Sequence, residues 1–145
     1  PYFLPDPGLI TALSVAALRG VEVRIVLPAH VNIVPVQWAA AAQLWQVLRP
    51  GCRVFLSPKP FDHSKLMVVD RHWALIGSTN WDPRSLRLNF ELDVELYCAT
   101  CASALDDHAQ ARIAESREVS LAELDGRPLG MKVRDGLARL LSPYL

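Results

Sequence analysis

The sequence has few cysteines, no long apolar run and no excess of charge of either sign. Cys52, Cys98 and Cys101 cannot all pair within one chain, which is typical of a reducing compartment rather than of a disulfide-stapled secreted domain. No stretch approaches the roughly 18 consecutive apolar residues of a membrane-spanning helix, so we expect this segment itself to be soluble. Fifteen basic residues balance fifteen acidic ones, which disfavours dedicated nucleic-acid binding, because nucleic-acid-binding domains normally present a basic surface.

Two local patterns have both a functional and a structural interpretation. Cys98 and Cys101 form a single CxxC pair without a second pair or a histidine at zinc-finger spacing, so ordinary buried thiols are the default. Residues 127–139 carry four basic side chains against Asp135 alone. This fits an anionic lipid surface, although such a pattern is more often a solvated helix face.

The length and the hydrophobic pattern predict one α/β domain over residues 1–145. The chain begins with proline and has no leader sequence, which indicates a piece of a longer protein. We expect helices over residues 8–19 and 36–48 and from about residues 102 and 129. We expect strands over residues 21–27, 53–56, 65–69, 73–77 and 91–97, with a tight hairpin at 69–72. The strands should form a mixed sheet flanked by helices on both faces.

The residues that point to chemistry are His63, Lys65 and Asp70, followed by Ser78 and Asn80. Residues two apart in a strand point the same way, so His63 and Lys65 should project from one face, and Ser78 and Asn80 from the adjoining strand. Packing does not explain such polar groups among apolar strands, whereas a phosphate diester does. A neutral imidazole attacks phosphorus, while the ammonium, hydroxyl and amide stabilise the phosphate oxygens.

These residues resemble the signature of the phospholipase D superfamily, which has His, Lys and Asp at this spacing and a following Gly-Ser-x-Asn element. The resemblance implies that His63 forms a covalent phosphohistidine and that Lys65 and Asn80 hold phosphate oxygens, with support from Ser78. It gives Asp70 a structural or electrostatic role. It implies no metal and no other cofactor.

The resemblance extends beyond the signature. Glu91 matches the downstream acidic position of the family, which orients the histidine, and Gly77 is expected to let the backbone approach the substrate closely. Other segments look like the C-terminal half of bacterial cardiolipin synthases: residues 1–6, 17–24, 80–85 and 137–143. The resemblance implies a phospholipase D-like phosphodiesterase domain with a motif core at about residues 57–91. It also implies a location at the cytoplasmic side of a bacterial inner membrane.

The family builds one active site from two such motifs, and this chain has one. His30, His72 and His108 lack the pattern and are expected to be surface or capped histidines. The second motif is therefore expected from another half of the same protein or from a homodimer mate.

Three functions stay open at this point. The leading hypothesis is phosphatidyl transfer from a phosphatidylglycerol-like phospholipid to an alcohol at a membrane surface, giving cardiolipin; with water as acceptor the enzyme would be a phospholipase. The second is a homodimeric, metal-independent phosphodiesterase or nuclease, which the balanced charge disfavours. The third is an inactive fragment or binding module that lacks its second motif.

Overall fold

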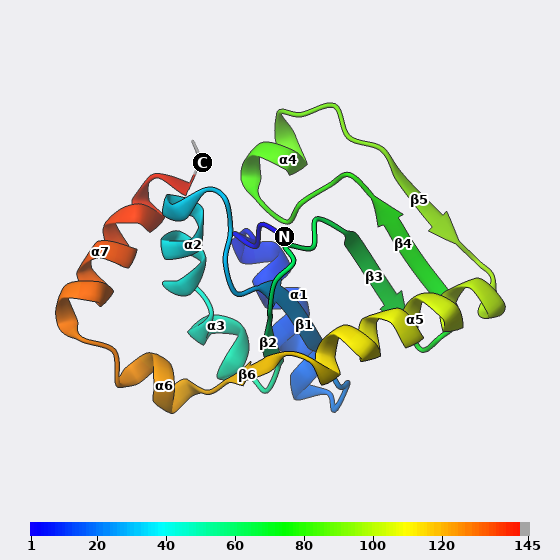
Figure 1. The fold of residues 1–145 in the computed structure, drawn as a ribbon, viewed down its shortest axis with the longest axis horizontal. Helices are drawn as coiled ribbons and strands as arrows, with labels where there is room; N and C mark the ends of the chain where they lie inside the picture. Colours follow the sequence, from blue (N-terminus) through cyan, green and yellow to red (C-terminus); the bar gives the residue numbers. More distant parts are fainter. Residues whose placement is uncertain (143–145) are drawn as a thin grey trace.

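Helices and strands alternate along the computed structural model, which describes residues 1–142 (Figure 1). The helices are α1 (Pro7–Leu18), α2 (Val34–Ala41), α3 (Trp45–Leu48), α4 (Pro83–Arg87), α5 (Ala99–Ala114), α6 (Leu121–Asp125) and α7 (Leu129–Leu140). The strands are β1 (Arg24–Pro28), β2 (Arg53–Ser57), β3 (Lys65–Val69), β4 (Trp73–Gly77), β5 (Asp93–Leu96) and β6 (Arg117–Val119). Pro143, which ends one of the segments that resemble cardiolipin synthases, lies outside the described residues.

The strands are divided between two three-stranded sheets. The first has the order β1-β2-β6, with β1 parallel to β2 and β6 antiparallel to it. The second has the order β3-β4-β5 and is antiparallel throughout. The parallel pair is connected through α2 and α3, as a parallel pair requires a long crossover. The predicted α/β class is confirmed, and the mixed pairing belongs to the first sheet.

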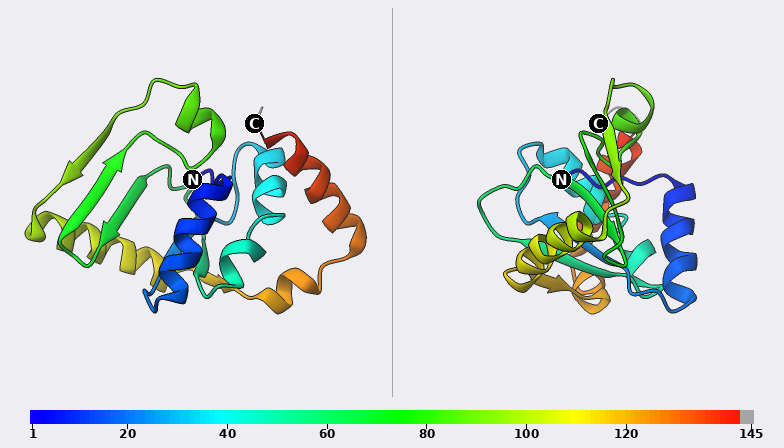
Figure 2. Two further views of the ribbon diagram at one scale, coloured as in Figure 1. Left: turned by 180° about the vertical axis from the view of Figure 1, so that it is seen from behind. Right: turned by 90° about the vertical axis from the view of Figure 1, so that its right-hand side faces the viewer.

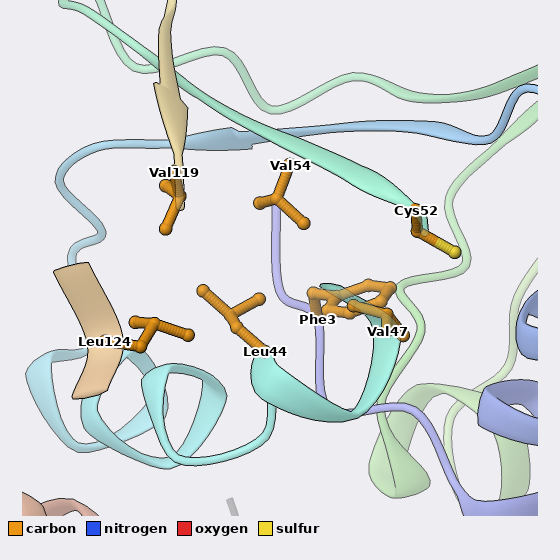
Figure 3. Close-up of a cluster of buried hydrophobic side chains, with 7 residues drawn as sticks. All are labelled: Phe3, Leu44, Val47, Cys52, Val54, Val119 and Leu124. Atoms are coloured by element: carbon orange, nitrogen blue, oxygen red, sulfur yellow. The ribbon is translucent and has the colours of Figure 1, made fainter. Parts of the chain in front are cut away.

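Helices cover both faces of the first sheet. Figure 2 shows α1 and α5 on opposite sides of the strands. Side chains of α3 and α6 join Val54 of β2 in the main hydrophobic core (Figure 3). Leu13 and Ala17 of α1 pack against this core. Helix α5 packs against β2 from the other side and continues across β3 and β4, where Ala74 and Ala102 are fully buried. Helix α5 therefore connects the two sheets.

The predicted helix over residues 36–48 is two helices, α2 and α3, with a turn between them. Val36 and Ala39 of α2 pack in a second core with α7, whereas Leu44 and Val47 pack on the first sheet. The turn lets one segment contribute to two cores. The unpredicted elements α4, β6 and α6 have three to five residues, too few to show a hydrophobic period.

Two negative findings concern only residues 1–142. No helix there has the length and apolar character needed to cross a bilayer. No three histidine, cysteine or carboxylate side chains there lie close enough together to hold a metal ion.

The cysteines differ in their surroundings. Cys52 is buried in the main core. Cys98 and Cys101 are exposed, contrary to the expectation of buried thiols, because they lie at the N-terminus of α5. The Sγ of Cys98 accepts the backbone N–H of Cys101 at 3.4 Å.

Helix α7 packs on α2 around a buried carboxylate. Asp135 is fully buried and accepts hydrogen bonds from Arg127 Nη1 at 2.7 Å and from Arg134 Nη2 at 2.7 Å. The Arg134 guanidinium also lies 4.4 Å from the Trp38 ring centroid. The basic segment at residues 127–139 is therefore only partly a solvated face, because two of its arginines bind one buried aspartate.

Replacing Asp135 by Asn tests this charged centre. Asn keeps the volume but loses the charge, which leaves the Arg127 guanidinium without its anionic partner. We expect the free energy of unfolding in urea to fall by about 2 kcal/mol, since breaking a buried ion pair is costly. Asp125→Asn, at an exposed position in α6, is the control and should change the unfolding midpoint little. Equal effects of the two substitutions would contradict the assignment.

Candidate active site

His63 lies in the loop that leads into β3, and Lys65 is the first residue of that strand. Lys65 Nζ lies 2.9 Å from Nδ1 and 3.0 Å from Nε2 of His63. It also donates to the His63 carbonyl oxygen at 2.8 Å. The two side chains thus meet, but not through the alternation of a strand as predicted, because His63 precedes β3. Ser78 and Asn80 likewise follow β4 rather than lie in it.

The loop that carries His63 is held from α5. Arg112 donates from Nη2 to the Pro58 carbonyl at 3.4 Å, and its Nε lies 3.7 Å from an Asp62 carboxylate oxygen. Asp62 in turn accepts the Ser64 N–H at 2.8 Å. Arg112 therefore fixes the loop on both sides of Phe61. No local pattern pointed to this arginine, because it lies far along the chain from the motif.

Two aromatic rings flank the imidazole of His63. The Tyr2 ring centroid lies 6.3 Å away with its edge toward the imidazole, and the Phe61 centroid lies 5.8 Å away. Tyr2 is positioned by its neighbours, because Leu4 donates its N–H to the Trp81 carbonyl at 2.7 Å and Phe3 stacks on the Trp81 ring. The first residues of the chain thus line the site, which local sequence patterns did not reveal.

Glu91 accepts hydrogen bonds from polar groups that follow β4. Its carboxylate accepts hydrogen bonds from the Ser78 hydroxyl, from Ser85 Oγ at 2.6 Å and from Asn89 Nδ2 at 3.2 Å. The Ser78, Ser85 and Asn89 hydrogen bonds, with the Lys65 charge, hold the pKa of Glu91 below its ordinary value. Within residues 1–142, these are the side chains that bind Glu91, and His63 is not among them.

Asn80 lies between the Glu91 cluster and Tyr2. Its N–H donates to Ser85 Oγ at 3.0 Å, and its Oδ1 accepts the Tyr2 N–H at 3.5 Å. Asp82, two residues further along the chain, is buried and caps α4 by accepting the Ser85 N–H at 2.8 Å. Short helix α4 thus holds Asn80 on the side of the site where Tyr2 meets His63.

Asp70 is not brought to this cluster. It follows β3 in the hairpin turn, so the whole strand separates it from His63. Asp70 and Arg71 have φ angles of 51° and 60°, as the two central residues of a type I′ turn require, and the Asp70 carbonyl lies 2.6 Å from His72 Nδ1. Aspartate tolerates this left-handed conformation better than most residues. This position favours a structural over an electrostatic role for Asp70, and that role stays a proposal.

Gly77 is required by the close approach of β5. It pairs with Asp93, and a Cβ at Gly77 would lie 2.4 Å from the Leu92 carbonyl oxygen and 2.6 Å from Asp93 Cα. These are backbone atoms that cannot turn aside. The same Leu92 carbonyl accepts the Ser78 N–H at 3.0 Å. The glycine therefore sets the distance between β5 and the residue that binds Glu91.

The electrostatics of the pair favour a neutral imidazole. Burial and then the positive charge of Lys65 lower the pKa of His63 below its ordinary value. Burial also lowers the pKa of Lys65, with Glu91, Asp62 and Asp82 opposing it. At neutral pH the site therefore offers an imidazole lone pair beside an ammonium group, the combination expected of a nucleophile that attacks an anionic centre.

Comparisons with known proteins agree with this geometry. A family model described as cardiolipin synthase, PLD-like domain, matches residues 1–113. The chain is 37% identical over 145 residues to the major cardiolipin synthase ClsA of Bacillus subtilis and to cardiolipin synthase 1 of Staphylococcus epidermidis. Each match covers 100% of this chain, which spans about 30% of the length of these curated relatives.

A solved structure has the same fold. The crystal structure of the phospholipase D family member Nuc from Salmonella typhimurium superposes with a TM-score of 0.71. The match covers 82% of this chain and 78% of that chain, at 26% sequence identity.

The pKa of His63 should respond to the charge of Lys65. In Lys65→Gln the repulsion of the imidazolium by the ammonium is lost, so the pKa of His63 should rise, as measured by NMR titration of the ring protons. Lys59→Gln, in the same loop, is the control and should leave that titration unchanged. A His63 titration identical in Lys65→Gln and wild type would show that the ammonium does not act on the imidazole.

Gly77→Ala should destabilise the domain. The added methyl forces β5 away from β4, and we expect a loss of about 2 kcal/mol or more in the free energy of unfolding. Gly136→Ala in α7 is the control, because a Cβ there meets nothing within 4 Å and alanine is the better helix former. Urea denaturation of both variants gives the comparison. Gly77→Ala with wild-type stability would rule out the proposed backbone constraint.

Proposed function

This chain belongs to the family of cardiolipin synthase, PLD-like domains, and on that basis we propose that it carries the phosphorus-attacking half of a phosphatidyl-transfer site. The observation that carries the proposal is the contact between the Lys65 ammonium and the neutral imidazole of His63. Asn80 lies near this pair through its hydrogen bond with Tyr2, whose ring contacts His63. The substrate class is a phospholipid with a phosphodiester, such as phosphatidylglycerol.

In the first step, a ring nitrogen of His63 attacks phosphorus. A P–N bond forms, the P–O bond to the headgroup alcohol breaks, and the leaving oxygen takes a proton from a general acid. Lys65 neutralises the phosphate oxygens on which negative charge builds, and Asn80 donates to them from its amide. Ser78 supports this side of the site through Glu91, because its hydroxyl is held by the carboxylate.

In the second step, an acceptor alcohol attacks the phosphohistidine. Its oxygen forms the new P–O bond and loses its proton, and the P–N bond to His63 breaks. With a second phosphatidylglycerol as acceptor the products are cardiolipin and glycerol, and with water the product is phosphatidic acid. We assign to Glu91 the orientation of His63 once substrate is bound. The family resemblance implies this role, whereas in this structure Glu91 forms no hydrogen bond with His63.

The general acid of the first step is proposed to come from a second motif. The described part of the chain leaves an apolar rim beside Glu91: Leu88 and Leu92 are largely exposed and Phe90 is fully exposed. Large apolar side chains in this position favour a protein surface that covers the site. We assign that surface to another half of a longer protein.

A second candidate is a homodimeric phosphodiesterase. The match to the Salmonella phospholipase D family member covers 78% of that chain, so a fold unit of this size occurs as a whole polypeptide. Two copies of this chain would then supply the two histidines. The net charge of zero supports a small or lipid diester rather than a nucleic acid as substrate.

The reaction is tested with vesicles of phosphatidylglycerol. The longer protein that contains this segment should form cardiolipin and release glycerol, and His63→Ala should abolish both products. His72→Ala, in the hairpin turn, is the control and should retain activity. Quenching during turnover should trap a phosphorylated histidine at residue 63. Formation of neither cardiolipin nor phosphatidic acid would refute the phosphatidyl-transfer proposal.

Measurements on the isolated 145-residue chain distinguish the homodimeric phosphodiesterase from a half of a longer phosphatidyl-transfer enzyme. Its mass by light scattering and its turnover of a chromogenic phosphodiester are measured on the same fractions. An active dimer that His63→Ala silences supports the homodimeric phosphodiesterase. An inert monomer supports a site completed by another half of the longer protein.

A further inference from the structure

Helix α7 presents an apolar stripe to solvent. Residues are about 100° apart around an α-helix, so Leu129, Val133, Leu137 and Leu140 fall within roughly 80° of one another. All four are exposed, and Leu129 and Leu140 are 76% and 73% exposed. The helix lies at one end of the long dimension of the domain (Figure 1), where its outer face is open. Such a stripe on an otherwise well-packed helix points to a function.

The opposite face of α7 packs on the rest of the domain, and this packing does not involve the stripe. Ala138 and Asp135 are buried against α2, and Ser142 just beyond the helix is buried as well. The apolar residues on the outer face therefore add nothing to this packing.

Cations flank the stripe. On one side lie Lys132 and Arg139, both exposed, and neither forms an ion pair with a carboxylate among residues 1–142. Lys132 Nζ donates only to the Asp125 carbonyl oxygen, at 2.7 Å. On the other side lies Arg134, which Asp135 and Trp38 hold in place. An apolar stripe flanked by cations is the pattern of a helix that lies in a membrane interface.

A cavity of about 500 Å³ opens beside the same flank. Its lining includes Trp45, Arg127, Lys132 and Arg139. Asp125 also lines it and offsets part of the positive charge. The space and the basic side chains suit the phosphate of an anionic headgroup next to the stripe.

The inner face of α7 leads to the active site. Ala138 packs in one cluster with Leu4 and Tyr2, and the Tyr2 ring is the one whose edge meets His63. A membrane or partner bound to α7 would thus be connected to His63 through one layer of side chains, that of Ala138, Leu4 and Tyr2. Binding a bilayer through α7 would hold the site close to its lipid substrates.

From these observations we propose that α7 docks the domain on an anionic lipid bilayer, with the stripe in the interface and Lys132 and Arg139 on the headgroups. Charge complementarity selects a bilayer over a second protein, because unpaired cations line the edge of the stripe where headgroups would lie. The inference rests on the proposed function for its choice of lipid.

The test measures partition of the chain to vesicles by flotation. The His63→Ala chain is used throughout, so the result does not depend on turnover, and failure of docking is distinguished from failure of the proposed reaction. With vesicles that contain phosphatidylglycerol we expect binding, and with phosphatidylcholine alone at least about tenfold less. Arg139→Gln combined with Leu140→Gln should weaken binding about tenfold or more.

A matched control changes the same residue types at the end of another helix. Leu18 is 74% exposed and precedes Arg19 at the end of α1, so Leu18→Gln with Arg19→Gln removes an equal Leu-Arg pair and should bind as the parent chain does. Circular dichroism checks that both double variants fold. Two further measurements do not depend on the double variant. Binding should fall in Lys132→Gln, which changes an exposed position, and it should also fall with added salt.

Three outcomes would overturn the proposal. One is equal binding of the α7 double variant and its parent. Another is equal binding to vesicles with and without phosphatidylglycerol. The third is a dimer in solution that the α7 double variant dissociates, which would assign the stripe to a second copy of the chain.

Discussion

Strand β5 runs so close to Gly77 that no side chain fits between them. That approach aligns Leu92 with Ser78, and the two exchange hydrogen bonds: the Ser78 N–H donates to the Leu92 carbonyl, and the Leu92 N–H donates to Ser78 Oγ at 3.0 Å. Glu91 directly precedes Leu92, so its carboxylate is placed on the Ser78 hydroxyl. The hydrogen bonds from Ser85 and Asn89 then draw α4 onto the same carboxylate. The polar side of the site follows from one backbone contact.

The residue proposed as the nucleophile is held by a different set of contacts. His63 lies in a loop, and the groups that fix it are Arg112 from α5 and Tyr2 from the start of the chain. Helix α5 also packs on β2, β3 and β4, so it sets the loop relative to both sheets. Because Tyr2 and Arg112 lie nearly a whole chain apart, the site forms only when the entire domain is folded. A short segment containing the motif would not reproduce it.

Short-range sequence patterns predicted the strands and turns that depend on neighbouring residues alone. The strands over residues 65–69 and 73–77 and the turn between them agree residue for residue, since alternation and turn chemistry are short-range. The contact of Lys65 with His63 does not follow from that period, because His63 lies in the loop before β3. The contributions of Tyr2 and Arg112 had no such signal, because contacts across long sequence separations leave no periodicity. The resemblance singled out Glu91, and its role toward His63 stays a prediction; that Ser78 and Ser85 bind its carboxylate had no signal in the sequence.

The distribution of charge explains how a chain of zero net charge can act on anions. Many arginines are bound to carboxylates, as Arg53 is to Glu118 and Arg71 to Asp106. They therefore present little net field, and the continuous basic track that a polynucleotide needs does not arise from them. Lys65 and the cations of α7 are different, because no carboxylate forms an ion pair with them within residues 1–142 except where Asp135 holds Arg134. One cation beside His63 matches the single phosphodiester of the proposed reaction, and a few beside an apolar stripe match the proposed membrane surface.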